Sequence, residues 1–210
     1  MERGLVGSTW RVYRRTMAYK PRIEVPLGCF HVVTRGNNKR RIYDDDWDRT
    51  MFVMLVTHVA GKYGWTILAY VLMRNHYHLV IRLGACEKGL SRGMCELNTA
   101  YALEYNKRHG RINHLFGKRY WSRYLKTDAD ILSACRYVVL NPVRAGAVDD
   151  PALWKWSSYL ATIGTALSIP HFAADAVLRL FAQTTRARAI AAYTTFCDPG
   201  RFGPVPRQPP

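Results

Sequence analysis

Two apolar, β-branched runs meet in the stretch Tyr70-Val71-Leu72-Met73-Arg74-Asn75-His76-Tyr77-His78-Leu79-Val80-Ile81. Both runs have the composition of a strand, and the residues between them form a short connection. Side chains alternate between the faces of a strand, so His76 and His78 project side by side while Tyr77 points away. Paired imidazoles supply half of a metal site. Packing beside a sheet would explain the pair equally well, unless the chain also supplies a third ligand, a nucleophile and a substrate surface.

The segments around this stretch complete an α+β pattern. A strand is expected over 28–35, and Asp44-Asp45-Asp46 then places acids where a helix should begin. The other expected elements are that helix up to Gly64, strands over 65–72 and 76–83, a helix over 90–108, a strand over 119–125 and a helix over 128–140. This order predicts a ferredoxin-like antiparallel sheet with helices on one face.

Composition divides the chain into four parts. Residues 1–24 are basic and weakly patterned, which predicts an N-terminal arm. Residues 25–165 hold the strand and helix pattern and form the main domain. Residues 166–198 predict a C-terminal helical extension, and residues 199–210 are expected to be a disordered tail.

Charge is the most unusual property of the composition. The 210 residues include 31 Lys and Arg against 15 Asp and Glu, a formal net charge of +16. Such an excess favours a polyanionic partner, although ribosomal and membrane-surface proteins share it. The five cysteines form no C-x-x-C pair, and no apolar run approaches the length of a membrane span. These features predict a soluble protein of a reducing cytoplasm, with no membrane partner.

A second candidate group lies near the end of the helix expected over 128–140. Tyr137 and Asn141 are four residues apart, so on a helix they share one face. The amide oxygen of Asn141 is a suitable hard ligand for Mg²⁺ or Mn²⁺, and Tyr137 could act as a nucleophile if a cation activated it. Taken alone, Tyr137 could equally be a core residue, and Asn141 before Pro142 could simply end the helix.

The motifs together resemble a known family. They are Met73-Arg74-Asn75-His76-Tyr77-His78-Leu79-Val80, Tyr105 to Arg111, His114 to Tyr120, Tyr137 to Gly146 and Trp154 to Tyr159. In this order they resemble the REP-associated tyrosine transposases, which belong to the single-tyrosine HUH transposases (His, bulky residue, His). The resemblance runs from about Cys29 to Tyr159, and the C-terminal helices resemble an extension of longer family members.

This resemblance implies a ferredoxin-like or RRM-like catalytic domain, an activity and a set of site residues. The family cleaves and joins single-stranded DNA near hairpins and leaves a 5′-phosphotyrosine and a free 3′-OH. By resemblance, His76, His78 and Asn141 hold Mg²⁺ or Mn²⁺, and Tyr137 is the nucleophile. The implied partner is single-stranded DNA with REP-like palindromes, bound by a monomer or homodimer in the bacterial cytoplasm. No small-molecule substrate is implied.

The sequence departs from the family pattern at two positions. Tyr77 stands where a smaller apolar residue is common, although a bulky aromatic is compatible. Gly117 stands where the family favours glutamine, so any polar contact made there by relatives is in doubt. Neither change touches the implied chemistry.

Basic and aromatic residues form the expected DNA surface. Cations suit phosphates and aromatic faces suit unpaired bases, with stacking worth ~1–3 kcal/mol per base. The predicted DNA-binding residues are Arg35, Lys39, Arg40, Arg41, Lys107, Arg108, Arg111, Lys118, Arg119, Tyr120, Arg123 and Arg144. A solvated loop with its aromatics in the core is the alternative for any single one of them.

Two other functions compete with this interpretation. One is a replication initiator or plasmid relaxase, which shares the chemistry but often has a larger chain with extra domains. The other is a domesticated module that binds DNA or RNA hairpins without cutting them. A pure binding module would have no need of His76, His78, Tyr137 and Asn141 together.

Overall fold

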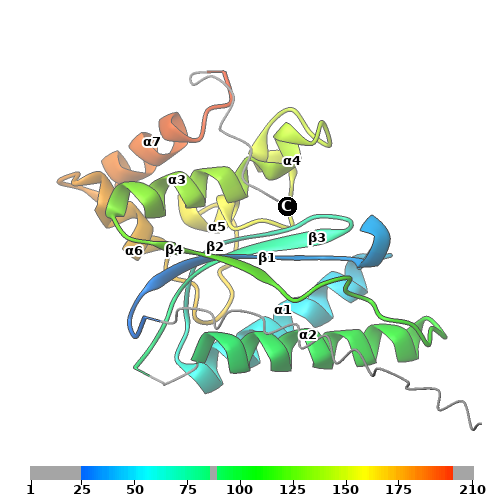
Figure 1. The fold of residues 1–210 in the computed structure, drawn as a ribbon. Helices are drawn as coiled ribbons and strands as arrows, with labels where there is room; N and C mark the ends of the chain where they lie inside the picture. Colours follow the sequence, from blue (N-terminus) through cyan, green and yellow to red (C-terminus); the bar gives the residue numbers. More distant parts are fainter. Residues whose placement is uncertain (1–24, 86–88, 201–210) are drawn as a thin grey trace, which may run out of the picture.

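A four-stranded antiparallel sheet organises the protein (Figure 1). The computed structural model describes residues 25–85 and 89–200. The strands are β1 (Cys29–Arg35), β2 (Thr66–Leu72), β3 (His76–Arg82) and β4 (Trp121–Leu125), in the spatial order β2-β3-β1-β4. Each neighbouring pair is antiparallel. The predicted ferredoxin-like sheet is therefore confirmed.

Helices cover both faces of this sheet. In Figure 1, α1 (Asp46–Tyr63) and α2 (Gly89–Arg108) lie below it, whereas α3 (Asp128–Val139) lies above it. The predicted placement of helices on one face holds for α1 and α2. The opposite face is covered by α3 and the helices of the C-terminal part, so in this detail the sequence-based expectation was incomplete.

Strand alternation separates two hydrophobic cores. On β3, Tyr77, Leu79 and Ile81 are buried in the core shared with α1 and α2. Val80 is buried in the second core, together with Ala134 of α3. Because side chains two apart share a face, His76 and His78 project toward α3.

Local capping explains where α1 and α3 begin. The Asp45 side chain accepts a hydrogen bond from the Asp48 backbone N–H at the start of α1. Thr127 and Asp130 form a reciprocal capping box at the start of α3. At its end, α1 stops at Gly64, whose φ of 66° lies in the left-handed region that favours glycine.

α3 ends at Val139, within one residue of the expected stop, but a second helix follows directly. After Leu140 the chain resumes as α4 (Asn141–Arg144), with Pro142 in its first turn. Proline is tolerated there because the first turn of a helix needs no donor from it. Asn141 therefore opens a helix, and this places its side chain one turn beyond Tyr137.

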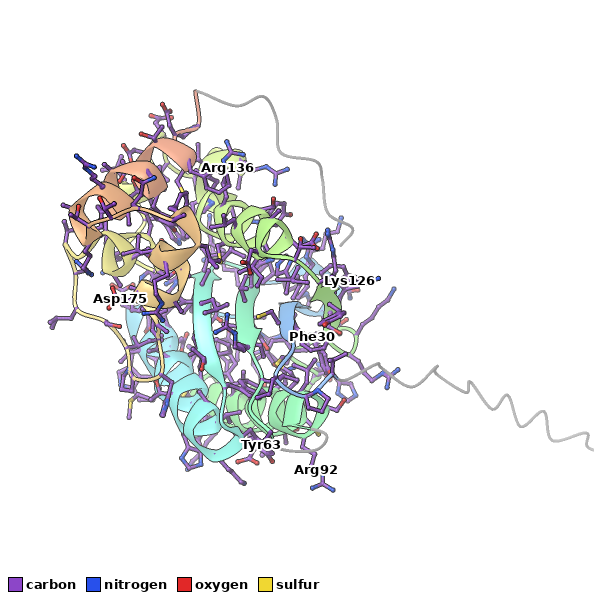
Figure 2. The ribbon with its side chains drawn as sticks, turned by 90° about the vertical axis from the view of Figure 1, so that its left-hand side faces the viewer. Phe30, Tyr63, Arg92, Lys126, Arg136 and Asp175 are labelled. Atoms are coloured by element: carbon purple, nitrogen blue, oxygen red, sulfur yellow. The ribbon has the colours of Figure 1, made fainter. Side chains whose placement is uncertain are left out.

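The C-terminal part packs against α3 and the β2 edge. It contains the short elements η2 (Pro151–Leu153), α5 (Tyr159–Ile163), α6 (Ala174–Leu178), η3 (Arg179–Phe181) and α7 (Arg186–Phe196). Arg136, labelled in Figure 2, donates from Nε to the Phe196 carbonyl at 2.6 Å and so ties α3 to α7. Bridges from Ser157 and Phe172 cover the outer edge of β2.

Some predictions concern residues outside this description. The basic arm over 1–24 and the tail beyond Gly200 lie outside the described residues. Across residues 25–85 and 89–200, no helix has both the length and the apolar character that a membrane crossing requires.

Candidate metal and tyrosine site

The three predicted metal ligands converge between β3 and the start of α4. Asn141 Oδ1 lies 3.2 Å from His76 Nε2. Asn141 Nδ2 lies 3.3 Å from His78 Nε2. His78 and Asn141 are buried and His76 is half-buried. Both Nε2 atoms therefore point at one amide group that arrives from a segment more than sixty residues later in the chain.

The predicted nucleophile lies beside this cluster. The ring centre of Tyr137 is 5.5 Å from that of His78. Only 9% of Tyr137 is exposed, so its ring is fixed by packing on the sheet face. Arg144, in the last turn of α4, places its Cζ atom 4.6 Å from the centre of the same ring. The turn at Leu140 thus brings a tyrosine, an amide and a cation together.

A third imidazole, His31, belongs to this site and was not predicted from the sequence. It lies on β1, is fully buried, and its Nε2 atom is 2.9 Å from His78 Nδ1. Its ring centre is 5.7 Å from that of Tyr137. The available signal was strand alternation, because Cys29, His31 and Val33 share the face that meets α3. A lone histidine in an apolar strand is ordinarily taken for a packing residue.

Asn75 fixes the orientation of His76. Its Nδ2 group donates to the Lys39 carbonyl at 2.9 Å, which turns Oδ1 toward His76. Asn75 Oδ1 then lies 2.7 Å from His76 Nδ1. An amide oxygen only accepts, so His76 carries its proton on Nδ1 and leaves the lone pair of Nε2 facing Asn141.

Burial keeps both histidines of the pair neutral. Desolvation, reinforced by the charge of Arg35, lowers the pKa of His76 to about 4. Desolvation also lowers the pKa of His78 well below its usual value, with further contributions from His31 and His76. A neutral imidazole is the form that binds metals, so no proton has to be displaced near pH 7.

The donor set fits a divalent cation. With His76 neutral and protonated on Nδ1, its Nε2 lone pair faces the lone pairs of Asn141 Oδ1 at 3.2 Å. Two acceptors at that distance repel each other unless a cation is shared between them. Two imidazole nitrogens and one amide oxygen form a mixed set compatible with Mg²⁺ or Mn²⁺. The Nδ1 atoms of His76 and His78 contact Asn75 and His31, respectively, and metal-ligating histidines typically make such a hydrogen bond through their second ring nitrogen.

A second cluster of possible metal ligands is already engaged in ion pairs. Atoms of Asp44, Asp48 and His109 lie within 4.8 Å of one another. However, Arg108 donates to Asp48 Oδ1 at 2.6 Å, and His109 Nε2 is 3.0 Å from the same oxygen. Tyr105 donates to Asp44 Oδ2 at 2.7 Å. A guanidinium in the cluster repels a cation, so this group serves chiefly to join the start of α1 to the end of α2.

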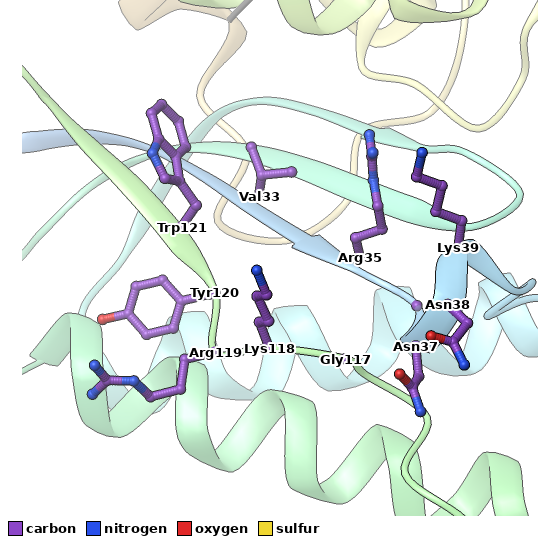
Figure 3. A pocket seen from close by; sticks show the side chains of 11 residues that line it. Val33, Arg35, Asn37, Asn38, Lys39, Gly117, Lys118, Arg119, Tyr120 and Trp121 are labelled. Carbon is purple, nitrogen blue, oxygen red and sulfur yellow. The ribbon is translucent and has the colours of Figure 1, made fainter. Parts of the chain in front are cut away.

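Several predicted DNA-binding residues gather around one pocket of about 490 Å³ (Figure 3). It lies where β1 and β4 diverge, beside η1 (Asn37–Lys39). Arg35 pairs directly with His76 across the sheet, so the pocket adjoins the metal and tyrosine site. Lining residues are Val33, Arg35, Gly36, Asn37, Asn38, Lys39, Gly117, Lys118, Arg119, Tyr120 and Trp121.

Three predicted DNA-binding residues, of which Tyr120 also lines the pocket, have structural partners. Arg108 forms ion pairs with Asp45 and Asp48, and its hydrogen bond lowers the pKa of Asp45 to about 2. Arg123 pairs with Asp130 at 2.8 Å. Tyr120 is 6% exposed, with its hydroxyl 3.1 Å from that of Ser91.

The remaining predicted DNA-binding residues outside the pocket are largely accessible. Arg40, Arg41, Lys107 and Arg144 are exposed, and the guanidinium of the half-buried Arg111 lies over the Tyr105 ring.

Comparison with known proteins establishes the class. A family model described as "Transposase IS200 like" matches residues 25–139, more than half of the chain. The chain belongs to this transposase family. The matched range includes His76, His78 and Tyr137, whereas Asn141 lies just beyond it.

Two individual proteins refine this assignment. A Haemophilus influenzae protein named as a REP-associated tyrosine transposase is 22% identical over 106 residues. That match covers 46% of this chain and 60% of the relative. A solved REP-associated tyrosine transposase bound to a REP hairpin superposes with a TM-score of 0.61 at 18% identity, covering 72% of this chain and 88% of the other. The predicted resemblance to REP-associated tyrosine transposases is confirmed, and the solved structure shows the shared fold.

Proposed function

We propose that this chain is a metal-dependent single-stranded DNA endonuclease and strand transferase that acts at REP-like hairpins. The observation that carries the proposal is the convergence of His76, His78 and Asn141 beside Tyr137. Membership of the transposase family supports the proposal. The cluster itself offers a nucleophile and a cation site in one place. Residues 25–165 form the catalytic domain in this proposal, and residues 166–198 its helical extension.

His76, His78 and Asn141 would hold one Mg²⁺ or Mn²⁺ ion. When bound, the ion supplies Lewis acid chemistry that polarises the phosphate and offsets its developing charge. The protein keeps both imidazoles neutral by burial and fixes the Nδ1 atom of His76 through Asn75. These contacts preorganise the site before DNA arrives, which lowers the reorganisation needed for reaction.

Tyr137 supplies the nucleophile. Its hydroxyl oxygen attacks the phosphorus and forms a bond to it, while the bond from phosphorus to the 3′-oxygen breaks. The hydroxyl proton is lost to solvent, and the departing 3′-oxygen takes up a proton to give a free 3′-OH. The DNA 5′-phosphate stays on Tyr137 as a phosphotyrosine ester, so the broken bond's energy is kept for rejoining. The guanidinium of Arg144, over the ring, helps to stabilise the negative charge.

The pocket beside the site would hold the unpaired strand. Its charged lining residues, Arg35, Lys39, Lys118 and Arg119, are all basic, and Trp121 adds an aromatic face. Trp121 also contacts His31, with ring centres 5.5 Å apart, so a base stacked there would lie near the reacting phosphate. This arrangement favours single-stranded DNA as the partner, and we propose that a monomer or homodimer binds it in the bacterial cytoplasm.

The experiment that tests this function uses hairpin oligonucleotides with unpaired flanks. A label at the 3′ end should move with the protein in a denaturing gel, because the 5′-phosphate of the downstream fragment is joined to Tyr137. A label at the 5′ end should appear on a shorter free strand. Both signals should require Mg²⁺ or Mn²⁺ and vanish with Tyr137→Phe.

Three other outcomes would contradict the proposal. Tight hairpin binding without an adduct, in the presence of either metal, would identify a non-cleaving binding module. Cleavage that ignores the hairpin would favour an initiator or relaxase type of nickase. An adduct that survives Tyr137→Phe would mean that another residue is the nucleophile.

A further inference from the structure

His31 is the polar residue of this sheet face whose role the proposed function leaves open. It is fully buried in the middle of β1, where an apolar side chain would be the simple choice. Its ring plane lies within 23° of that of His78, and the two ring centres are 5.1 Å apart. Burying an imidazole costs free energy unless hydrogen bonds compensate, so its presence calls for a reason beyond packing.

The donor and acceptor in each hydrogen bond of His78 follow from the chemistry of its partners. Asn141 Nδ2 is a donor group, and it lies 3.3 Å from His78 Nε2, which must therefore accept. A neutral imidazole carries one proton, so that of His78 is on Nδ1. His78 Nδ1 then donates to His31 Nε2 at 2.9 Å. The chain of bonds runs from Asn141 through His78 to His31.

This direction matters for metal binding. An imidazole nitrogen binds a cation through its lone pair, and in this tautomer the lone pair of His78 is on Nε2, facing Asn141. Without an acceptor at His31, the buried N–H on Nδ1 would be left unpaired, and the tautomer with the proton on Nε2 would gain in population. That tautomer cannot offer Nε2 to a cation.

We infer that His31 is a positioning residue that holds His78 in the Nδ1–H tautomer and presents its Nε2 atom to the divalent cation. This inference rests on the proposed function, because it assumes that His76, His78 and Asn141 bind the ion. His31 touches neither the ion nor the DNA in this account. It acts through its hydrogen bond of 2.9 Å to His78. The ring of the nucleophile, Tyr137, also packs against the His31 ring.

The test measures Mn²⁺ binding to the full chain without DNA, by the loss of the free Mn²⁺ electron paramagnetic resonance signal. His31→Phe keeps a flat ring but removes the acceptor, and we expect its Kd for Mn²⁺ to rise by about 10–100-fold. His31→Gln restores an acceptor oxygen and should recover most of that loss. His58→Gln, at an exposed histidine on α1, is the matched control and should bind like the wild type.

Two results would overturn the inference. Wild-type affinity in a folded His31→Phe variant would show that the acceptor is not needed. Equal losses in His31→Phe and His31→Gln would show that ring packing, and not the hydrogen bond, is what counts. If the wild type binds Mn²⁺ and His76→Ala does not, these results contradict the inference alone. Absence of Mn²⁺ binding by the wild type would contradict the proposed metal site, and the inference with it.

A second measurement does not depend on whether the variants fold. Long-range ¹H–¹⁵N correlation spectra of the wild-type protein report which nitrogen of each histidine ring is protonated, and the His78→Ala spectrum assigns the His78 signals. We expect the pattern of a ring protonated on Nδ1 for His78. A pattern protonated on Nε2 would overturn the inference even if both His31 variants fail to fold.

Discussion

The guanidinium carbon of Arg144 lies 4.6 Å from the centre of the Tyr137 ring. The two residues are brought together by the turn at Leu140, where α3 ends and α4 begins. Arg144 is exposed while Tyr137 is buried, so the cation lies on the solvent side of the ring. A phosphate that approaches the Tyr137 hydroxyl from solvent would therefore meet this positive charge.

Replacing Arg144 should slow cleavage more than it weakens DNA binding. We expect Arg144→Ala to lower the rate of adduct formation at saturating hairpin DNA by roughly a hundredfold, the usual cost of removing one charge-stabilising donor. Arg144→Lys should be intermediate, because lysine keeps the charge but loses the planar stacking group. Single-turnover gels measure the rate, with Arg188→Ala on α7 as the control. An unchanged rate in Arg144→Ala would refute this role.

Trp121 should contribute to binding of the unpaired strand. Loss of one stacked base costs ~1–3 kcal/mol, so Trp121→Ala should raise the Kd for a hairpin with an unpaired flank by about tenfold. An abasic site at the stacked position should weaken wild-type binding and leave the variant unaffected. Fluorescence anisotropy measures both. Trp47→Ala, at a tryptophan that is 55% exposed on α1, is the matched control. Equal effects of both tryptophan variants would count against the pocket.

Arg108 should contribute to stability and not to DNA affinity. The carboxylate of Asp48 is fully buried against Arg108 and His109, so Asp48→Ala should cost roughly 3 kcal/mol in the free energy of unfolding. Arg108→Ala should also destabilise, yet leave the Kd for hairpin DNA near the wild-type value. Lys118→Ala, in the pocket, should do the reverse. Urea denaturation measures the stability of the three variants, and DNA titration measures their Kd for hairpin DNA. A large loss of DNA affinity in Arg108→Ala would contradict a purely structural role for Arg108.

The stability of the metal-free protein should fall as the pH drops from 7.5 to 5. The pKa of His76 is about 4 in the folded protein and near 6.5 when unfolded. Between these values only the unfolded chain takes up the proton, so the free energy of unfolding decreases as the pH falls. His78, whose pKa is also lowered, acts in the same direction.

Urea denaturation in the presence of EDTA measures this slope. His76→Gln should flatten it, and the exposed His58→Gln variant should not. Restricting the range to pH 5 and above keeps the carboxyl groups, which titrate lower, out of the comparison. A slope that is the same in wild type and His76→Gln would show that His76 is not held neutral by the fold.

Local signals explain how much of the fold could be predicted. The helix expected over 90–108 and the strand expected over 76–83 were placed within a residue of α2 and β3, because alternation and helical spacing are properties of the chain itself. The helices were expected on one face of the sheet, whereas α3 covers the face opposite to α1 and α2. An amphipathic pattern shows that a helix has an apolar face, but the path of the chain decides which sheet face receives it.

The site, like the fold, was predictable only where the signal lies in the local sequence. The motif residues His76, His78, Tyr137 and Asn141 were named together, and the structure brings them together. His31 was missed because its relation to His78 depends on the register between β1 and β3, which no local pattern contains.

The partners of the basic residues could not be predicted for a related reason. A count of charges cannot reveal that Arg108 faces Asp45 and Asp48, which lie about sixty residues earlier in the chain. Side-chain partners that are distant in sequence become visible only once the helices are packed.

The central claim is that the Tyr137 hydroxyl becomes joined to DNA. Mass spectrometry of the proteolysed adduct, formed with hairpin DNA and Mn²⁺, tests this most directly by locating the modified residue. The account predicts a nucleotide 5′-phosphate on the peptide that contains Tyr137, and no adduct from Tyr137→Phe. A phosphate ester on any other tyrosine, or an adduct that forms without Tyr137, would contradict it.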